Sequence, residues 1–185
     1  MKDSLWSVDL FRCESVTLKT HWVMVVMDLF TRRIIGFSIQ AGAVDGIALC
    51  RMFNHATAQQ GMPRYLCSDH DPLFEFHRWK ANLRVLEIDE VKTVPYTPTS
   101  HPFVERLIGT IRRAFLDQVL FWNSVDLERK LSAFRDYYHC ERVHSGIVGA
   151  TPFEIGGEPR VQPADLNSFR WKTHCRGRYQ LPEAA

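Results

Sequence analysis

The sequence predicts an α/β fold, a ribonuclease-H-like mixed five-stranded sheet with three antiparallel strands, then parallel strands, and flanking helices. Two observations support this prediction. Three short runs rich in Val, Ile, Met and Phe follow one another with only polar turns between them, at residues 5–12, 21–28 and 33–40. Beyond them, segments with helical spacing of apolar residues alternate with short strand-like runs, as in strands joined by crossover helices.

The alternating part begins with a helix. Residues 44–60 carry apolar side chains at helical spacing and are followed by Gly61-Met62-Pro63, a helix stop. Residues 64–68 then read as a short strand that runs directly into the turn Asp69-His70-Asp71-Pro72. An acidic turn is therefore expected at the C-terminal end of the fourth strand.

The remaining elements follow the same alternation. Residues 74–83 are predicted to be helical, and residues 85–94 to contain the fifth strand. A proline-punctuated loop at residues 95–102 cannot be regular structure. Two amphipathic helices come next, one with an apolar stripe from Val104 to Phe115 and one over residues 125–142. This order of elements is the one found in ribonuclease-H-like domains.

Composition sets limits on the class of protein. The 185 residues, of which 45% are hydrophobic, suit a globular core at residues 1–155 with an extension at residues 156–185. No run approaches the roughly 20 apolar residues of a membrane span, and the N-terminal residues lack a secretory signal, so a cytoplasmic location is expected. The five cysteines form no C-x-x-C pair, which argues against a disulfide framework or a zinc ribbon.

The charge is distributed unevenly although the net charge is only +2. Towards the C-terminus, basic residues alternate with aromatic ones and face a single acid, Glu183; the basic residues are Arg170, Lys172, Arg176 and Arg178. Cations contact phosphates and aromatic faces stack on bases, so this extension is a candidate DNA contact. The alternative is that the aromatic residues pack this segment against the rest of the protein.

Three carboxylates occupy positions at which they could meet. Asp9 lies in the middle of an apolar strand, where an acid is costly unless it is paired or binds a cation. Asp69 ends the fourth strand, which neighbours the first in this topology, and Glu105 begins the helix expected to pack on them. Convergent carboxylates repel one another unless divalent cations neutralise them, and their hard oxygens suit magnesium or manganese.

The helix of Glu105 has a second, polar face. Gly109, Arg112 and Arg113 follow Glu105 at spacings that place them on or beside one side of the helix. A phosphate backbone could lie along the two cations, with Gly109 leaving room for it. The alternative is a solvated helix face, with Glu105 at the positive end of the helix dipole.

These acids and their flanking residues resemble the integrase catalytic core shared by retroviral integrases and insertion-sequence transposases, which carries two aspartates and a glutamate. The resemblance covers residues 5–154, and 35 residues separate Asp69 from Glu105, as in that family. The matching segments are LWSVDLF, VVMDLFTRRIIGFSI, YLCSDHDPLF, TPTSHPFVERLIGTIRR and YYHCERVHSGIVGATPFE.

Two glycines usual in that family are replaced in this chain. His70-Asp71-Pro72 follows the second acid, and His101-Pro102 precedes the helix of the third. Loss of glycine changes the conformations open to both loops, because glycine accepts positive φ and close approach of DNA. Asp71 is a rival to Asp69 as a ligand, and we prefer Asp69. Asp28, despite its family-like setting, is expected to have a structural role.

The resemblance implies a polynucleotidyl transferase that processes DNA 3′-ends and transfers strands during transposition. It would use two Mg²⁺ or Mn²⁺ ions about 4 Å apart, with Asp9 bridging both and Asp69 and Glu105 holding one each. The implied partners are transposon ends, target DNA and further copies of the chain, in bacterial cytoplasm and nucleoid. Two alternatives stay open, a nuclease that only hydrolyses and a degenerate core that only binds DNA.

Such enzymes recognise their DNA ends through an N-terminal helix-turn-helix region. This chain begins almost at the first strand, so we expect either a fragment or an isolated core. The end sequence and the choice of target are not encoded in any motif of this segment.

Overall fold

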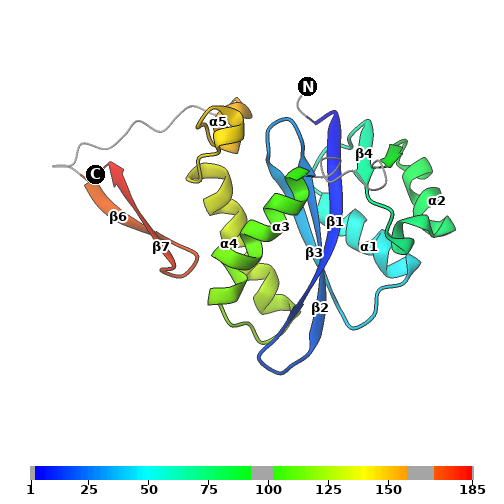
Figure 1. The fold of residues 1–185 in the computed structure, drawn as a ribbon, viewed down its shortest axis with the longest axis horizontal. Helices are drawn as coiled ribbons and strands as arrows, with labels where there is room; N and C mark the ends of the chain where they lie inside the picture. The colour runs from blue at the N-terminus through cyan, green and yellow to red at the C-terminus, as the bar shows by residue number, and fades with distance from the viewer. Residues whose placement is uncertain (1–2, 93–101, 158–168, 185) are drawn as a thin grey trace. The chain divides into compact units, whose positions relative to one another are not determined.

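The computed structural model describes residues 3–92, 102–157 and 169–184 of the chain (Figure 1). Of the loop predicted at residues 95–102, residues 95–101, including His101, lie outside the described residues, and the assignment of Pro102 to the loop is wrong because it is the first residue of a helix. Two compact units are present, Met1–Glu128 and Arg129–Ala185. The first contains the central sheet, and the second contains most of the last long helix and a small hairpin.

The central sheet has five strands in the order β3-β2-β1-β4-β5. The first three pair antiparallel, whereas β4 pairs parallel to both β1 and β5. The fold class predicted from the sequence is therefore confirmed. The strands are β1 Leu5–Glu14, β2 Thr20–Asp28, β3 Ile34–Ala41, β4 Tyr65–Ser68 and β5 Asp89–Lys92.

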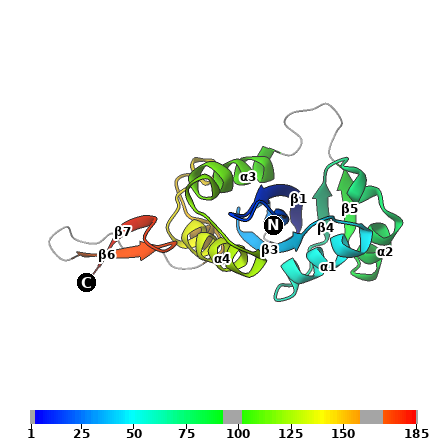
Figure 2. The ribbon, with the colours of Figure 1, turned by 90° about the horizontal axis from the view of Figure 1, so that it is seen from below.

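Helices cover both faces of this sheet. Helix α1 (Gly46–Thr57) contacts β2 and β3, while α3 (Pro102–Ala114) contacts β1 and β2, and Figure 2 shows the two helices on opposite sides. Helix α2 (His77–Val85) packs beside α1. Asp45 begins α1 by accepting a hydrogen bond from the backbone N–H of Ala48 at 2.7 Å, which satisfies a donor that the helix leaves unpaired.

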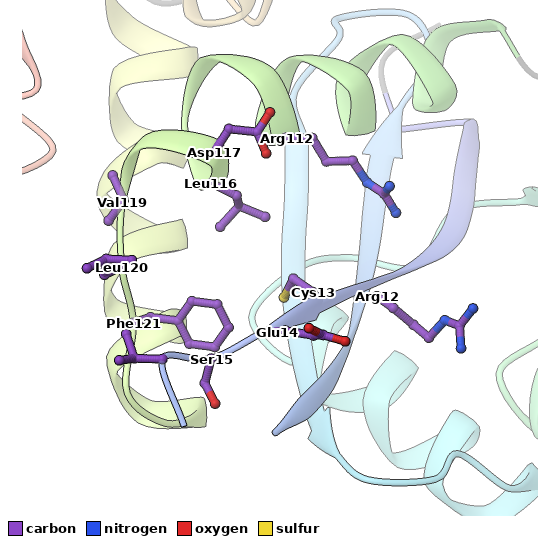
Figure 3. Close-up of a pocket in the computed structure, with 11 residues that line it drawn as sticks. Arg12, Cys13, Glu14, Ser15, Arg112, Leu116, Asp117, Val119, Leu120 and Phe121 are labelled. Atoms are coloured by element: carbon purple, nitrogen blue, oxygen red, sulfur yellow. The ribbon is translucent and has the colours of Figure 1, made fainter. Parts of the chain in front are cut away.

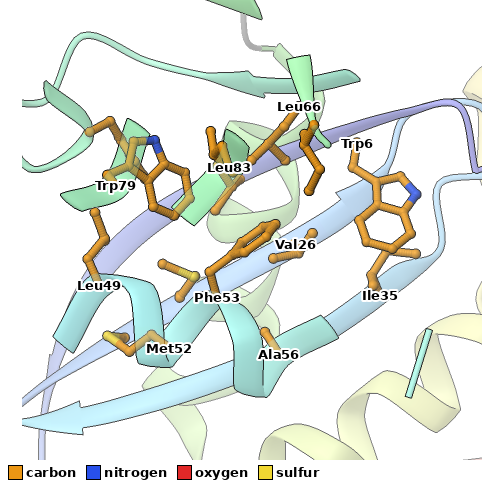
Figure 4. Close-up of a cluster of buried hydrophobic side chains, with 14 residues drawn as sticks. Trp6, Val26, Ile35, Leu49, Met52, Phe53, Ala56, Leu66, Trp79 and Leu83 are labelled. Carbon is orange, nitrogen blue, oxygen red and sulfur yellow. The ribbon is translucent and has the colours of Figure 1, made fainter. Parts of the chain in front are cut away.

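A buried apolar cluster lies between the sheet, α1 and α2 (Figure 4). Trp6 and Val26 from the sheet meet Phe53 from α1 and Trp79 from α2. Gly36 in β3 allows this close packing, because a Cβ there would lie 2.0 Å from a backbone oxygen of α1. The glycine is thus required by helix–sheet contact and not by its own backbone angles.

The second unit contains most of α4 (Ser124–Cys140), the short elements η3 (Ser145–Ile147) and α5 (Pro152–Ile155), and a hairpin of β6 (Phe169–His174) and β7 (Tyr179–Ala184). Tyr179 of the hairpin stacks on Tyr137 of α4 with ring centroids 4.1 Å apart and an interplanar angle of 1°. The sequence predicted a basic, aromatic extension but not this hairpin. The predicted boundary between residues 155 and 156 stays a prediction.

None of the helices that the structure describes is both long enough and apolar enough to cross a membrane.

Candidate active site

Asp9 lies in the middle of β1, opposite Val25 of β2, and its side chain is half-buried. Its carboxylate oxygen Oδ1 accepts a hydrogen bond from the backbone N–H of Leu10 at 2.6 Å. Burial raises the pKa of Asp9 to about 7, the Leu10 hydrogen bond opposes this, and the negative charges of Asp69, Glu105 and Asp71 raise it further. The acids predicted from the sequence therefore lie close enough to act on Asp9.

Asp69 follows β4 directly, and β4 runs parallel to β1 beside Trp6 and Ser7. Oδ1 of Asp69 accepts from the backbone N–H of Asp71 at 3.0 Å. Because β4 ends where β1 continues, Asp69 lies at the same end of the strand pair as Asp9. The parallel pairing, which the sequence predicted, brings these two acids together.

Asp71, the rival to Asp69, has a different role in this turn. Its Oδ1 accepts from the backbone N–H of Leu73 at 2.8 Å and begins the short helix η1 (Pro72–Glu75). Proline suits the first position of such a helix, where no N–H is needed. His70-Asp71-Pro72 thus forms a capped turn, and the preference for Asp69 over Asp71 as a ligand stays a prediction.

Glu105 lies in the first turn of α3, and its side chain is exposed, whereas Val104 and Leu107 beside it are buried. Pro102 occupies the first position of α3 and has no N–H to leave unpaired. The contacts of α3 with β1 place Glu105 near Asp9, whose pKa it helps to raise. The third predicted acid therefore lies near enough to the first for its charge to raise the pKa of Asp9.

Among residues 3–92, 102–157 and 169–184, no three His, Cys, Asp or Glu side chains stand in a metal-ligating arrangement. Three like charges do not approach one another closely without a cation between them. The donor set nevertheless fits a hard divalent cation, because carboxylates supply hard oxygen ligands and the charges of Asp69, Glu105 and Asp71 all act on half-buried Asp9. A bound cation would favour the charged form of Asp9, which burial and, to a smaller extent, the neighbouring carboxylates disfavour.

A polar network behind Asp69 was not predicted from the sequence. Nζ of Lys92 on β5 donates to the backbone oxygens of Asp69 at 3.1 Å and of Phe74 at 3.3 Å. Lys92 also pairs with Glu90 at 3.0 Å, and Glu90 accepts from the hydroxyl of Ser68 at 2.6 Å. The alternation of half-buried Glu90 and Lys92 along β5 is the sequence signal that identifies this network.

The polar face of α3 differs in part from the prediction. Arg112 is exposed and lies over the ring of Phe11, 5.5 Å from its centroid. The guanidinium of Arg113 lies over Gly109, 3.0 Å from where a Cβ would be. Gly109 therefore leaves room for this flexible side chain, and the expectation that it also leaves room for a phosphate backbone stays a prediction.

The basic residues of the C-terminal extension lie on the hairpin. Arg170 and Lys172 on β6 pair with Glu183 on β7 at 3.5 and 3.2 Å. Arg176 and Arg178 lie at the turn, which contains three successive residues with positive φ, Cys175, Arg176 and Gly177. The single acid of the extension is thus shared by two of its four cations, and a DNA contact there stays a prediction.

Asp28 at the end of β2 is fully buried and has the structural role that was expected. Its carboxylate accepts from the backbone N–H and the hydroxyl of Thr31 and, more weakly, from the N–H of Phe30. These bonds hold the turn between β2 and β3, so Asp28 needs no metal ion to be satisfied.

Residues 86–152 match the model of the integrase core domain family. A 31.7 kDa uncharacterized protein of insertion element IS407 from Burkholderia multivorans is 22% identical over 163 residues, which are 86% of this chain. The chain spans 57% of the length of that relative.

Two solved structures are similar in fold. The simian T-cell lymphotropic virus intasome, in complex with the PP2A regulatory subunit B56 gamma, has a TM-score of 0.67 at 20% identity, covering 98% of this chain and 68% of the other. The dimeric HTLV-2 integrase catalytic core domain in complex with magnesium has a TM-score of 0.64 at 17% identity, covering 84% and 97%. The resemblance to an integrase or transposase core, inferred from the motifs, is confirmed.

Proposed function

We propose that this chain, an integrase-type core, catalyses the metal-dependent processing of DNA 3′-ends and their transfer into target DNA during transposition. The observation that carries the proposal is the raised pKa of Asp9, half-buried on β1 and acted on by the charges of Asp69 and Glu105. Surroundings that disfavour the charge of an acid are typical of a carboxylate that binds a cation, and this supports a ligand role for Asp9 in the proposal.

Asp9, Asp69 and Glu105 would hold two divalent cations, Mg²⁺ or Mn²⁺, and magnesium is present with the similar HTLV-2 core. When bound, the cations supply charge stabilisation to the attacking and leaving oxygens of an in-line displacement at phosphorus. The protein orients its own ligands for this. The N–H of Leu10 fixes one oxygen of Asp9, and the N–H of Asp71 fixes one oxygen of Asp69.

No side chain has to act as a covalent nucleophile in such a reaction. Water attacks first and frees a 3′-hydroxyl, which then attacks a phosphodiester of the target and releases a 3′-hydroxyl there. The DNA partners are therefore transposon ends and target DNA. A multimer of the chain is proposed because two ends must be joined, and the similar viral core has been solved in dimeric and trimeric forms.

The test combines plasmid nicking with joining of a labelled 3′-end, both with Mn²⁺. Wild type should nick and join, and Asp9→Asn, Asp69→Asn and Glu105→Gln should each lose both reactions while keeping the circular dichroism of the folded protein. Asp71→Asn is the matched control, because it replaces another acid of the same turn, one whose side chain caps η1. It should retain activity.

Each other outcome contradicts a defined part of the proposal. Activity kept by Asp69→Asn and lost by Asp71→Asn would assign the ligand to Asp71. Nicking without joining would favour a hydrolytic nuclease. A wild type that neither nicks nor binds Mn²⁺ in calorimetry would favour a core that only binds DNA.

A further inference from the structure

The side of β1 that faces β4 is open beyond its first residues. Strand β1 pairs with β2 along Trp6 to Glu14, but with β4 only along Leu5 to Ser7. From Asp9 onward, no strand in the described part of the chain pairs with this side of β1. An open strand edge presents a row of backbone N–H and C=O groups.

The directions of these backbone groups follow from the hydrogen bonds at the two ends of the strand. The backbone oxygen of Ser4 accepts a hydrogen bond from the backbone N–H of Tyr65 on β4, so even-numbered residues of β1 direct their backbone groups to this side. On the same side, the backbone N–H of Leu10 donates to the carboxylate of Asp9. Because backbone groups alternate in side along a strand, the N–H groups of Arg12 and Glu14 face the open side as well. At the far end, the N–H of Val16 is taken by the oxygen of Phe121.

Two arginines flank this open edge. Arg12 lies over the ring of Trp22 on β2, 5.3 Å from its centroid, and Arg112 lies over the ring of Phe11. Both side chains are exposed, and neither takes part in an ion pair with any residue that the structure describes. Burial raises the pKa of the Cys13 thiol to about 11, and the nearby Arg112 charge opposes this rise.

Both arginines line one cavity of about 370 Å³ (Figure 3). Their side chains reach to one side of it, whereas apolar residues such as Phe121 lie on the other. Glu14 and Asp117 also line the cavity, so two acids accompany the two arginines in its lining. A sheet edge with outward N–H groups between two cations is a concave site for anions.

The open edge continues directly from the candidate active site. Arg12 follows Asp9 by three strand residues, which is about 10 Å, and Arg112 follows Glu105 by seven helical residues, which is also about 10 Å. Asp69 and Glu105 lie near enough to Asp9 to raise its pKa, and the two arginines line the same cavity from opposite faces of the sheet, Arg12 over Trp22 and Arg112 over Phe11. A DNA strand held at the acids would pass the arginines about three nucleotides away, at 3.4 Å per nucleotide.

We propose that the open edge of β1 is a track for the backbone of one DNA strand, with Arg12 and Arg112 as its phosphate contacts. This inference rests on the proposed function, since the strand is placed by the acids. It assigns a role to Arg12, which no motif of the sequence indicated, and it gives Arg112 a defined place on the DNA.

Binding to a labelled duplex without divalent cation tests the track independently of catalysis. Arg12→Gln and Arg112→Gln should each lower the slope of log affinity against log salt by about 1, and affinity about 8-fold at 0.1 M salt. Arg12→Lys should retain the slope, because it keeps the charge. Arg51→Gln, which alters an exposed arginine of α1 away from this edge, is the matched control and should change neither quantity.

A second measurement locates the contact on the DNA. Single neutral methylphosphonates placed along each strand should weaken binding of wild type at one or two positions, about three nucleotides from the reacting phosphate. Arg12→Gln and Arg112→Gln should lose this sensitivity. If both variants bind DNA with the wild-type salt slope and the wild-type methylphosphonate profile, the track is overturned and the proposed function still stands. If wild type does not bind DNA at all, both proposals are overturned.

Discussion

Replacement of Asp9 by asparagine should stabilise the metal-free protein at pH 8 and leave its stability nearly unchanged near pH 4. The pKa of Asp9 is raised from 3.8 to about 7, mainly by burial. Below 3.8 the carboxyl is protonated in both the folded and the unfolded states. Between pH 3.8 and about 7 the unfolded state has lost this proton while the folded state retains it, so stability falls over this range and levels off above pH 7.

The magnitude follows from the size of the shift. A shift of about three pKa units at 1.36 kcal/mol per unit gives a ceiling of about 4 kcal/mol in the free energy of unfolding. Asp9 is only half-buried, and solvent screens part of this effect, so we expect about 2 kcal/mol. For a protein of this size that is a rise of roughly 4–8 °C in melting temperature.

The assay is urea unfolding of wild type and Asp9→Asn at a series of pH values from 4 to 8. Asparagine keeps the oxygen that accepts from the N–H of Leu10, so the variants differ mainly in charge. Asp89→Asn, at an exposed position of β5, is the control and should show no such trend. A difference between Asp9→Asn and wild type that stays flat across this range would refute the reasoning.

Addition of Mn²⁺ at pH 8 extends the same experiment. A cation that binds only the folded protein stabilises it by about 2.7 kcal/mol at 100 times its dissociation constant. Wild type should gain this stability and lose its disadvantage relative to Asp9→Asn, which should gain little. Equal stabilisation of both proteins would show that Asp9 is not a ligand.

Two further predictions concern packing and positioning. Gly36→Ala should destabilise the protein by about 3 kcal/mol or more, because its methyl group would meet the backbone of α1. Gly61→Ala should not destabilise the protein, because the space around Gly61 is open. Thermal unfolding of the two variants tests the difference. Lys92→Met should lower strand-transfer kcat about 10-fold, because it frees the backbone oxygen of Asp69. Lys80→Met is the control and should keep the wild-type kcat, since Lys80 pairs with Glu75 as Lys92 does but does not contact Asp69. Equal rates in the two variants would contradict a positioning role for Lys92.

Local features were predictable because they depend on short spacings. Short runs of apolar residues marked the strands, and an apolar stripe from Val104 to Phe115 marked the helix that carries Glu105. The buried Asp28 at a strand end was correctly given a structural role, since its partners are the next few residues of the same turn. Such patterns require no knowledge of which distant segments meet.

The sequence by itself determined the class of fold, the three acids and the order in which the elements carry them. Only the tertiary structure decided that burial raises the pKa of Asp9, that Lys92 holds the turn of Asp69, and that the short β4 leaves the edge of β1 open beside Arg12. The physical reason is that these properties arise between segments far apart in the chain, where strand length, pairing and packing set the distances and no local spacing records them.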